Sequence, residues 1–209
     1  MHISMKPNVR DVNIPAGNPK IPPRAYHHGN LRATLVTEGL KAIAEHDRAE
    51  VSLRDLARRI GVSPNAVYRH FADKNALLAA MAAEGFRRLS AAGVTAEALV
   101  PADDAQGRLR AYGRTYIQNA RENPALFRLM FTCRIDGDEE LKSAAERAFA
   151  GLRESVARVT GRTLEDEVVQ VGTLYAWSLV HGLSHLALDG RIAGDSDAAI
   201  DAVLRFAAR

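Results

Sequence analysis

The sequence predicts an all-α protein in which a small N-terminal helix-turn-helix head of three helices precedes a larger C-terminal helical bundle. Apolar residues recur at helical spacing through most of the chain after residue 26, and no stretch alternates apolar and polar residues as a half-buried strand does. The breaks between these stretches fall at Pro, Gly, Asn and Asp. The expected divisions are an arm over residues 1–25, a head over 26–72 and a body over 73–209.

The arm is basic and rich in proline. Residues 1–25 contain five prolines and few large apolar side chains, which predicts a flexible segment of extended character. Its four Lys and Arg residues against one Asp would let it follow a nucleic-acid groove. An unremarkable leader or a misassigned start site explains the composition equally well.

The head is expected to open with a helix that runs over about 26–46. Its apolar stripe consists of Leu31, Leu35, Leu40 and Ile43. Asn30 or Gly29 near the start of this helix, and Arg32 in its first turns, are candidates for contacts with a phosphate backbone.

Residues 52–78 predict two short helices joined by a tight turn and followed at once by a third helix. Ser52 can cap the first helix, and Gly61 ends it at a position that requires positive φ. Ser63 restarts the chain as an N-cap, with Pro64 at the first helical position, where its missing N–H costs nothing. The apolar residues around the turn are Leu53, Leu56, Ala57, Ile60, Val62 and Val67. This pattern is typical of a helix-turn-helix, which offers its second helix to the major groove of DNA.

The same segment resembles the DNA-binding domain of the TetR-type (tetracycline repressor) family of bacterial regulators. The resemblance rests on Leu53, Leu56, Ala57, Gly61, Val62, Ser63, Tyr68, His70, Phe71, Lys74, Leu77 and Leu78. In that family Tyr-x-His-Phe ends the recognition helix, and a Lys a few residues later begins a connecting helix. The chain departs from the family at Asn75, where a Glu usually follows the Lys.

The recognition helix is expected over Pro64–Phe71, which is barely two turns, so few side chains can reach base edges. Asn65 can pair with adenine and Ala66 can touch a thymine methyl group. The expected DNA-binding residues are Ser52, Ser63, Asn65, Ala66, Tyr68, Arg69, His70 and Lys74. Within this set Tyr68, His70 and Lys74 suit phosphate contacts. The alternative for Tyr68 and His70 is that they only pack the small head.

The distribution of charge favours the same end of the chain. Residues 1–94 hold 14 Lys and Arg against 8 Asp and Glu, a charge of +6, whereas residues 95–209 hold 14 against 17, a charge of −3. A basic head on an acidic body is what phosphate attraction at one end requires.

The body is expected to be helical to its end. A connecting helix should run from Asp73 to about Ala92 and end near Gly93. Later helices are expected over 103–121, 124–133, 137–160, 164–188 and 196–208.

The body carries a second signature over residues 175–183. The only tryptophan, Trp177, precedes His181 by four residues, so both lie on one helix face, and Gly182 permits close approach of another helix. Together with the opening over 26–32, this segment resembles the TetR-type subfamily named for a Trp–His–Gly motif. The resemblance implies a homodimer in which the last two long helices join the partner's pair in a four-helix bundle. The apolar residues that could form it are Leu174, Leu179, Leu183, Leu186, Ala187, Ile200, Val203, Leu204 and Phe206.

In this family a small-molecule effector usually binds inside the C-terminal bundle and shifts the spacing of the two heads. The candidate lining residues are Tyr112, Tyr116, Phe127, Met130, Phe131, Cys133, Phe149, Trp177 and His181. Aromatic and Met residues at helical spacing are also what an ordinary core contains. As a pocket, the set favours a mostly apolar ligand, aromatic ones included.

Metal sites, cofactors and catalytic residues are not expected. His181 and His185 are four residues apart, but the segment lacks the Glu of a metalloprotease helix and a third ligand is not evident. The adjacent His27 and His28 would point in different directions. Two alternatives to a regulator stay open: a metal-dependent enzyme that uses His181 and His185, and a non-specific DNA-binding protein.

The single cysteine, Cys133, excludes an intrachain disulfide and suits a reducing cytoplasm. Nothing resembles a signal peptide, and no apolar run approaches membrane-spanning length. The sequence therefore predicts a cytoplasmic, ligand-responsive transcriptional regulator that binds double-stranded DNA as a homodimer. By family precedent it would most often be a repressor on a near-palindromic operator.

Overall fold

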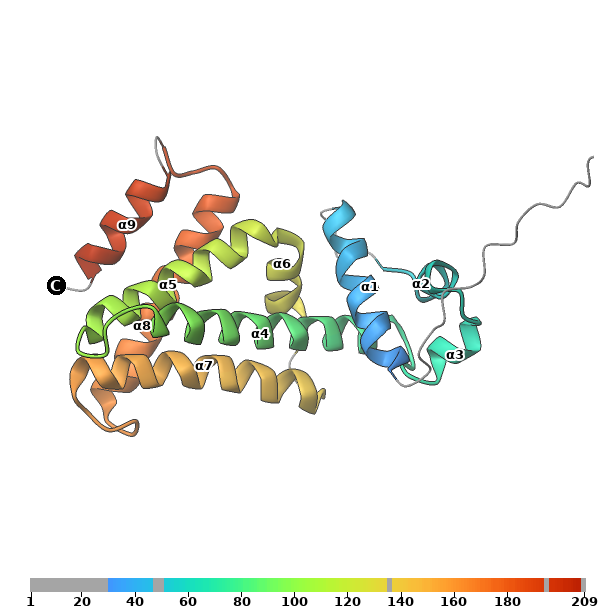
Figure 1. Ribbon diagram of the computed structural model, residues 1–209, viewed down its shortest axis with the longest axis horizontal. Coiled ribbons are helices and arrows are strands. Elements are labelled where there is room, and N and C mark those ends of the chain that lie inside the picture. Colours follow the sequence, from blue (N-terminus) through green and yellow to red (C-terminus); the bar gives the residue numbers. More distant parts are fainter. Residues whose placement is uncertain (1–29, 47–50, 135–136, 194–195, 208–209) are drawn as a thin grey trace, which may run out of the picture.

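The computed structural model describes residues 30–46, 51–134, 137–193 and 196–207, and the arm over 1–25 lies outside them (Figure 1). Within the described residues all regular secondary structure is helical, which confirms the all-α prediction. The helices are α1 (Leu31–His46), α2 (Leu53–Ile60), α3 (Pro64–Tyr68), α4 (Lys74–Ala98), α5 (Ala105–Glu122), α6 (Pro124–Thr132), α7 (Glu139–Thr160), α8 (Glu167–Leu188) and α9 (Ser196–Ala207).

Helices α1, α2 and α3 form the head, at the right of Figure 1. Ser52 caps α2 by accepting a hydrogen bond from the backbone N–H of Asp55, and Ser63 caps α3 in the same way through Ala66. Between the two helices Gly61 takes a φ of 73°, the left-handed conformation that ends α2. The fully buried side chains of the head core are Leu35, Ile43, Leu56, Val67 and Phe71. The predicted helix-turn-helix is confirmed.

The recognition helix is shorter than expected. α3 ends at Tyr68 rather than Phe71, and Arg69 is its C-cap residue. The backbone N–H of His70 bonds to the carbonyl of Val67, so the last turn tightens while Phe71 enters the core. Phe71 thus lies in the turn that follows the helix and packs into the head core.

α4 is longer than expected and joins the head to the body. It starts at Lys74 behind its N-cap Asp73 and continues through Gly93 to Ala98, so the prediction that Gly93 ends it is wrong. Gly93 instead lets another helix approach, because a Cβ at this position would lie 2.5 Å from the ring of Tyr112 on α5. A glycine that serves packing cannot be told from a helix terminator by sequence alone.

The body is a bundle in which α4 and α7 lie side by side, while α5 packs against α4, α7 and α8 (Figure 1). α6 packs on α1, α4 and α5, so it lies at the junction of body and head. α9 packs on α5 at the end of the molecule far from the head. The starts and ends of α5 to α9 agree closely with the predicted spans, and the side chains of Asp104, Asp138 and Asp166 cap the starts of α5, α7 and α8. No helix in the described part of the chain is long and apolar enough to cross a membrane.

Candidate DNA-binding surface and effector cavities

The outer side of α3 carries most of the residues expected to bind DNA. Val67 is fully buried and fixes the helix to the head core, whereas Asn65, Tyr68 and Arg69 are exposed and Ala66 is half-buried. His70 is exposed just beyond the helix. The structure thus brings these side chains to the surface of one short helix and the turn that follows it.

Ser52 and Lys74 line a surface hollow of about 630 Å³ formed by α1, α2 and the start of α4, together with Asp55, Arg58 and Arg59. Arg58 pairs with Asp55, and the Arg59 guanidinium lies 2.6 Å from the carboxylate of Glu45 on α1. Lys74 is exposed at the first position of α4. The Oγ atoms of Ser52 and Ser63 already accept capping hydrogen bonds, so each hydroxyl has its proton free to donate.

Asn30 and Arg32, at the start of α1, have structural partners. The Asn30 side chain accepts a hydrogen bond from the backbone N–H of Ala33, which caps α1. The Arg32 guanidinium bonds to Glu140 on α7 and lies over the Phe71 ring, 5.2 Å from its centroid. The prediction that Arg32 approaches a phosphate therefore conflicts with the contacts that this side chain makes.

Arg32, Arg87 and Glu140 form a group that we call the junction triad. Arg87 on α4 bonds to Glu140 at 3.2 Å and to Glu84 at 3.0 Å. One carboxylate on α7 thus connects a helix of the head with the helix that links head and body. All three side chains of the triad are partly exposed, so each ion pair contributes modestly to stability.

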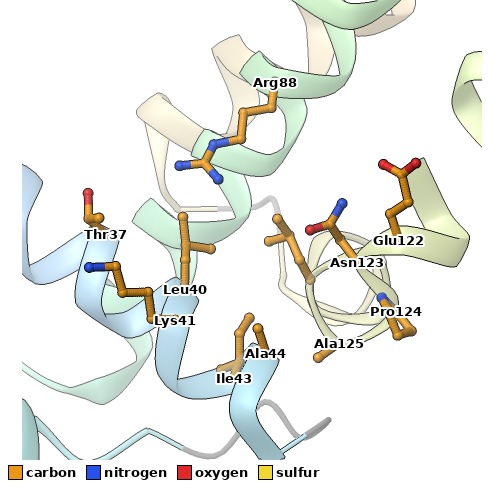
Figure 2. A pocket seen from close by; sticks show the side chains of 11 residues that line it. Thr37, Leu40, Lys41, Ile43, Ala44, Arg88, Glu122, Asn123, Pro124 and Ala125 are labelled. Atoms are coloured by element: carbon orange, nitrogen blue, oxygen red, sulfur yellow. The ribbon is translucent and has the colours of Figure 1, made fainter. Parts of the chain in front are cut away.

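A pocket of about 370 Å³ lies beside the contact between α1 and α6 at the same junction (Figure 2). Leu40, Ile43 and Ala44 of α1 face Pro124 and Ala125 at the start of α6. Above them the view shows the Arg88 side chain from α4, with Lys41, Glu122 and Asn123 around the rim. The contact between the head and α6 therefore leaves unfilled space on one side.

Two mainly apolar pockets lie between helices of the body, and each is partly open to solvent. The larger, of about 450 Å³, is lined by Phe86 and Leu89 of α4 and by residues of α5, α6, α7 and α8; the smaller, of about 220 Å³, lies among α5, α7, α8 and α9. Tyr116 and Trp177 line both cavities, so these two rings form the partition between them.

The predicted pocket residues divide between these cavities and the core behind them. The residues that line the larger cavity are Tyr116, Met130, Phe131, Cys133, Phe149 and Trp177. Tyr112 lines the smaller one. Phe127 and His181 line neither; their rings pack against each other and against Tyr116, with centroids 5.5 to 6.3 Å apart. Sequence reasoning missed Phe86, Leu89 and Glu146, because nothing local in α4 or α7 shows which helix face meets the cavity.

Hydrogen bonds hold the partition in place. The Tyr116 hydroxyl and His181 Nδ1 are 2.8 Å apart, and the Trp177 side chain also hydrogen-bonds to Tyr116. Burial raises the pKa of Tyr116, while burial and the nearby His185 lower the pKa of His181. Both groups are therefore neutral at physiological pH, and the Tyr116 hydroxyl already has partners on either side.

Tyr112 is fixed in a similar way. Its hydroxyl donates to the backbone carbonyl of Ala148 at 3.2 Å, and burial, with smaller contributions from Glu97 and Glu154, raises its pKa to about 12. Burial, with a contribution from Asp138, also raises the pKa of Cys133. A raised pKa is the opposite of what an activated thiol needs.

His181 and His185 lie close together, with ring centroids 4.8 Å apart. In the described residues there is no group of three or more His, Cys, Asp or Glu side chains that could hold a metal ion. The two rings instead pack on Phe127, at 5.5 Å each. This geometry suits an aromatic cluster.

One face of α8 exposes apolar residues to solvent. The exposed large apolar residues of α8 and α9 are Val168, Val171, Leu174, Tyr175, Leu186 and Phe206. Gly182 lies on the same face, and a Cβ there would meet nothing within 4 Å. By contrast Leu183, Ile200 and Leu204, which were also expected in a dimer bundle, are buried inside this chain.

Comparisons with known proteins agree with this arrangement. Residues 35–81 match the model of the bacterial regulatory proteins of the tetR family, and residues 109–207 match the model of the tetracyclin repressor-like C-terminal domain. No curated protein gives a significant match.

Among solved structures, the chain is similar to a protein of unknown function from Rhodococcus sp. RHA1, with 28% identity, 89% of this chain and 97% of that chain covered, and a TM-score of 0.76. It shares its fold with the TetR family transcriptional regulator PfmR from Thermus thermophilus, at 20% identity, 84% and 97% coverage and a TM-score of 0.59. The chain also shares its fold with a TetR variant from Acinetobacter baumannii AYE in complex with minocycline. The identity is 22%, 85% of this chain and 93% of that chain are covered, and the TM-score is 0.58.

Proposed function

Because the chain belongs to the tetR family of bacterial regulatory proteins and is a DNA-binding transcriptional regulator, we propose that it is a homodimeric cytoplasmic repressor. A small, mainly apolar effector that enters the body would release it from a near-palindromic operator. The observation that carries this proposal is the combination, in one chain, of an exposed recognition helix with a body that is hollow inside and apolar outside. In this scheme residues 26–72 contain the DNA-binding domain, and residues 73–209 bind the effector and the partner subunit.

The head supports the DNA part of the proposal. Asn65 stands exposed on α3 and can pair with adenine, and the Ala66 methyl can touch thymine. Arg69 lies further along the groove, and Tyr68 and His70 flank it. Ser52 and Lys74, on the neighbouring hollow, suit the phosphates that fix the register of α3.

The uncovered face of α8 supports the dimer. A stripe of apolar side chains with an open glycine at its centre suits the close approach of a helix from a second copy. The two heads would then read half-sites about 34 Å apart, or a small multiple of that, on one face of the DNA. The Trp177–His181–Gly182 segment lies on this helix, and we assign the chain to the subfamily with that motif as part of the proposal.

The junction triad offers a route from effector to head. α7 lines the larger cavity through Ala145, Ala148 and Phe149 and carries Glu140 two turns earlier. A ligand that displaces α7 would pull Glu140 away from Arg32 and Arg87, and the cavity between α1 and α6 leaves room for the head to turn. A ligand changes the equilibrium of head positions only by its different affinity for the two states.

Selection of genomic fragments by the purified full chain, followed by footprinting, tests the proposal. We expect one inverted repeat that competes strongly with bulk DNA and binds two chains. The same repeat should be released by compounds that change the emission of Trp177, the only tryptophan, which lines both body cavities. Uniform coating of DNA without a preferred sequence would instead favour the alternative of a non-specific DNA-binding protein.

A further inference from the structure

The larger body cavity has an unusual balance of side chains. Five of its eleven lining residues are aromatic, namely Phe86, Tyr116, Phe131, Phe149 and Trp177. The faces of aromatic rings carry partial negative charge, and rings that surround a site therefore attract positive charge to it. The walls favour a ligand that is both apolar and cationic.

The only charged side chain that lines this cavity within the described residues is Glu146 of α7. It is exposed, and it stands three residues before Phe149, so the two lie on one face of the helix at the mouth of the cavity. Phe149 is 41% exposed, although its ring packs edge-on against Trp177 with centroids 5.8 Å apart. The part of the Phe149 side chain that does not contact Trp177 is therefore left uncovered beside a carboxylate.

Hydrogen-bonding groups are scarce on these walls. The Tyr116 hydroxyl is occupied by His181 and Trp177, and Cys133 contributes a thiol whose pKa is raised by burial and by Asp138. A primary amine that entered would lose hydrogen bonds to water without replacement. A quaternary cation has no N–H groups that need hydrogen-bond partners. The free energy needed to remove it from water is also smaller than for a primary amine, because its charge is spread over a large apolar surface.

We propose that the larger cavity binds bulky apolar onium cations, such as quaternary ammonium or phosphonium compounds, with the Glu146 carboxylate at its mouth and the rings of Phe149 and Trp177 against the charge. This inference rests on the proposed function, because it names the chemical class of the effector. The volume of about 450 Å³ suits a cation with several apolar substituents. Anionic amphiphiles such as fatty acids are disfavoured by the same charge.

The test uses two near-isosteric probes of opposite charge, tetraphenylphosphonium and tetraphenylborate, titrated into the purified full chain by calorimetry and by Trp177 emission. We expect the cation to bind at least about 10-fold more tightly than the anion. Glu146→Gln should reduce that preference about 3- to 10-fold, as loss of one partly screened charge contact implies. Glu154→Gln, on the same helix but outside both cavity linings, is the matched control and should leave the preference unchanged.

A second probe pair separates the aromatic contribution from size. Benzyltrimethylammonium and its neutral isostere neopentylbenzene fill the same space, so only the cation senses the ring quadrupole. Phe149→Leu keeps an apolar side chain and should weaken the cation about 3- to 10-fold while it leaves the neutral compound within about twofold.

Equal binding of both charges, or equal effects of Glu146→Gln and Glu154→Gln, would overturn the inference. If the chain bound a specific operator and an uncharged or anionic compound released it while the onium probes failed, the inference would be wrong and the proposed function would stand. Failure to find any preferred operator would count against the proposed function itself.

Discussion

The head and the body of this regulator differ in how far their apolar side chains are exposed to solvent. In the head Leu35, Ile43, Leu56 and Val67 are at most 1% exposed, and the exposed side of α3 is mainly polar. In the body two cavities of about 220 and 450 Å³ remain between the helices, while Val171, Leu174 and Phe206 stand more than half exposed. The body also has a buried core, which includes Ile117, Met130 and Leu141, but unlike the head it exposes several large aliphatic side chains to solvent.

The difference follows from what each region must bind. A helix that reads DNA has to be held rigidly, since the groove discriminates by the placement of single side chains, and close packing supplies that rigidity. An effector site needs empty volume, and a dimer face needs exposed apolar area. Substitutions should therefore act differently in the two regions.

The largest effect is expected on the outer face of the body. Val171→Glu combined with Leu174→Glu would place two carboxylates on the proposed dimer face, where burial of each unpaired charge costs several kcal/mol. We expect the dissociation constant of the dimer to rise by more than about 100-fold. Sedimentation at micromolar concentration measures it, and specific operator binding should fall in parallel.

Leu99→Glu is the control for this double substitution, because Leu99 is 84% exposed but lies just after α4, outside α8 and α9. It should leave the dimer intact. A dimer that survives both changes would contradict the placement of the interface on α8.

Inside the head, neighbouring residues of α3 should separate stability from recognition. Val67→Ala removes a fully buried side chain and should lower the free energy of unfolding by about 2 kcal/mol. Asn65→Ala should change it by less than about 0.5 kcal/mol but remove about 1–3 kcal/mol of base discrimination at one position of each half-site. Denaturant unfolding and mobility shifts against operator variants give the two values. An unaltered base preference would remove Asn65 from the readout.

The junction triad tests how the two regions communicate. Glu140→Gln breaks the ion pairs to Arg32 and Arg87, which are partly exposed. The free-energy difference between the two head positions should therefore change by about 1 kcal/mol. Operator binding without effector should weaken about fivefold, and by reciprocity effector binding should tighten by a similar factor.

Glu38→Gln is the matched control for the triad, since it removes an ion pair that lies within α1 alone. Both affinities should stay within about twofold of the parent. If Glu140→Gln behaved like this control, the triad would be structural and the coupling would run through another contact.

The smallest effect is expected at Lys74, which is exposed at the start of α4. Lys74→Ala should weaken binding to all sequences alike and lower the slope of log affinity against log salt by about one unit, as loss of one phosphate contact requires. A salt titration with operator and with unrelated DNA measures it. An unchanged slope would place Lys74 away from the DNA.

Sequence reasoning worked where structure is decided within a few residues. Ser52, Gly61 and Ser63 predicted the helix-turn-helix because caps and positive-φ turns depend on neighbours in the chain. The breaks at Pro124 and Gly161 made the start of α6 and the end of α7 predictable in the same way. The roles of individual residues in DNA and effector binding remain predictions.

Contacts between distant residues decided the rest. Gly93 lies within α4, where the ring of Tyr112 leaves no room for a Cβ, and Phe71 packs into the head core beyond the end of α3. Arg32 meets Glu140 across 108 positions of sequence, a pairing that no local pattern indicates. The sequence by itself determined the helices and the motif, since hydrogen bonds and caps act over one turn. Only the tertiary structure decided which helix faces enclose the cavities, because their volume depends on side chains from five helices at once.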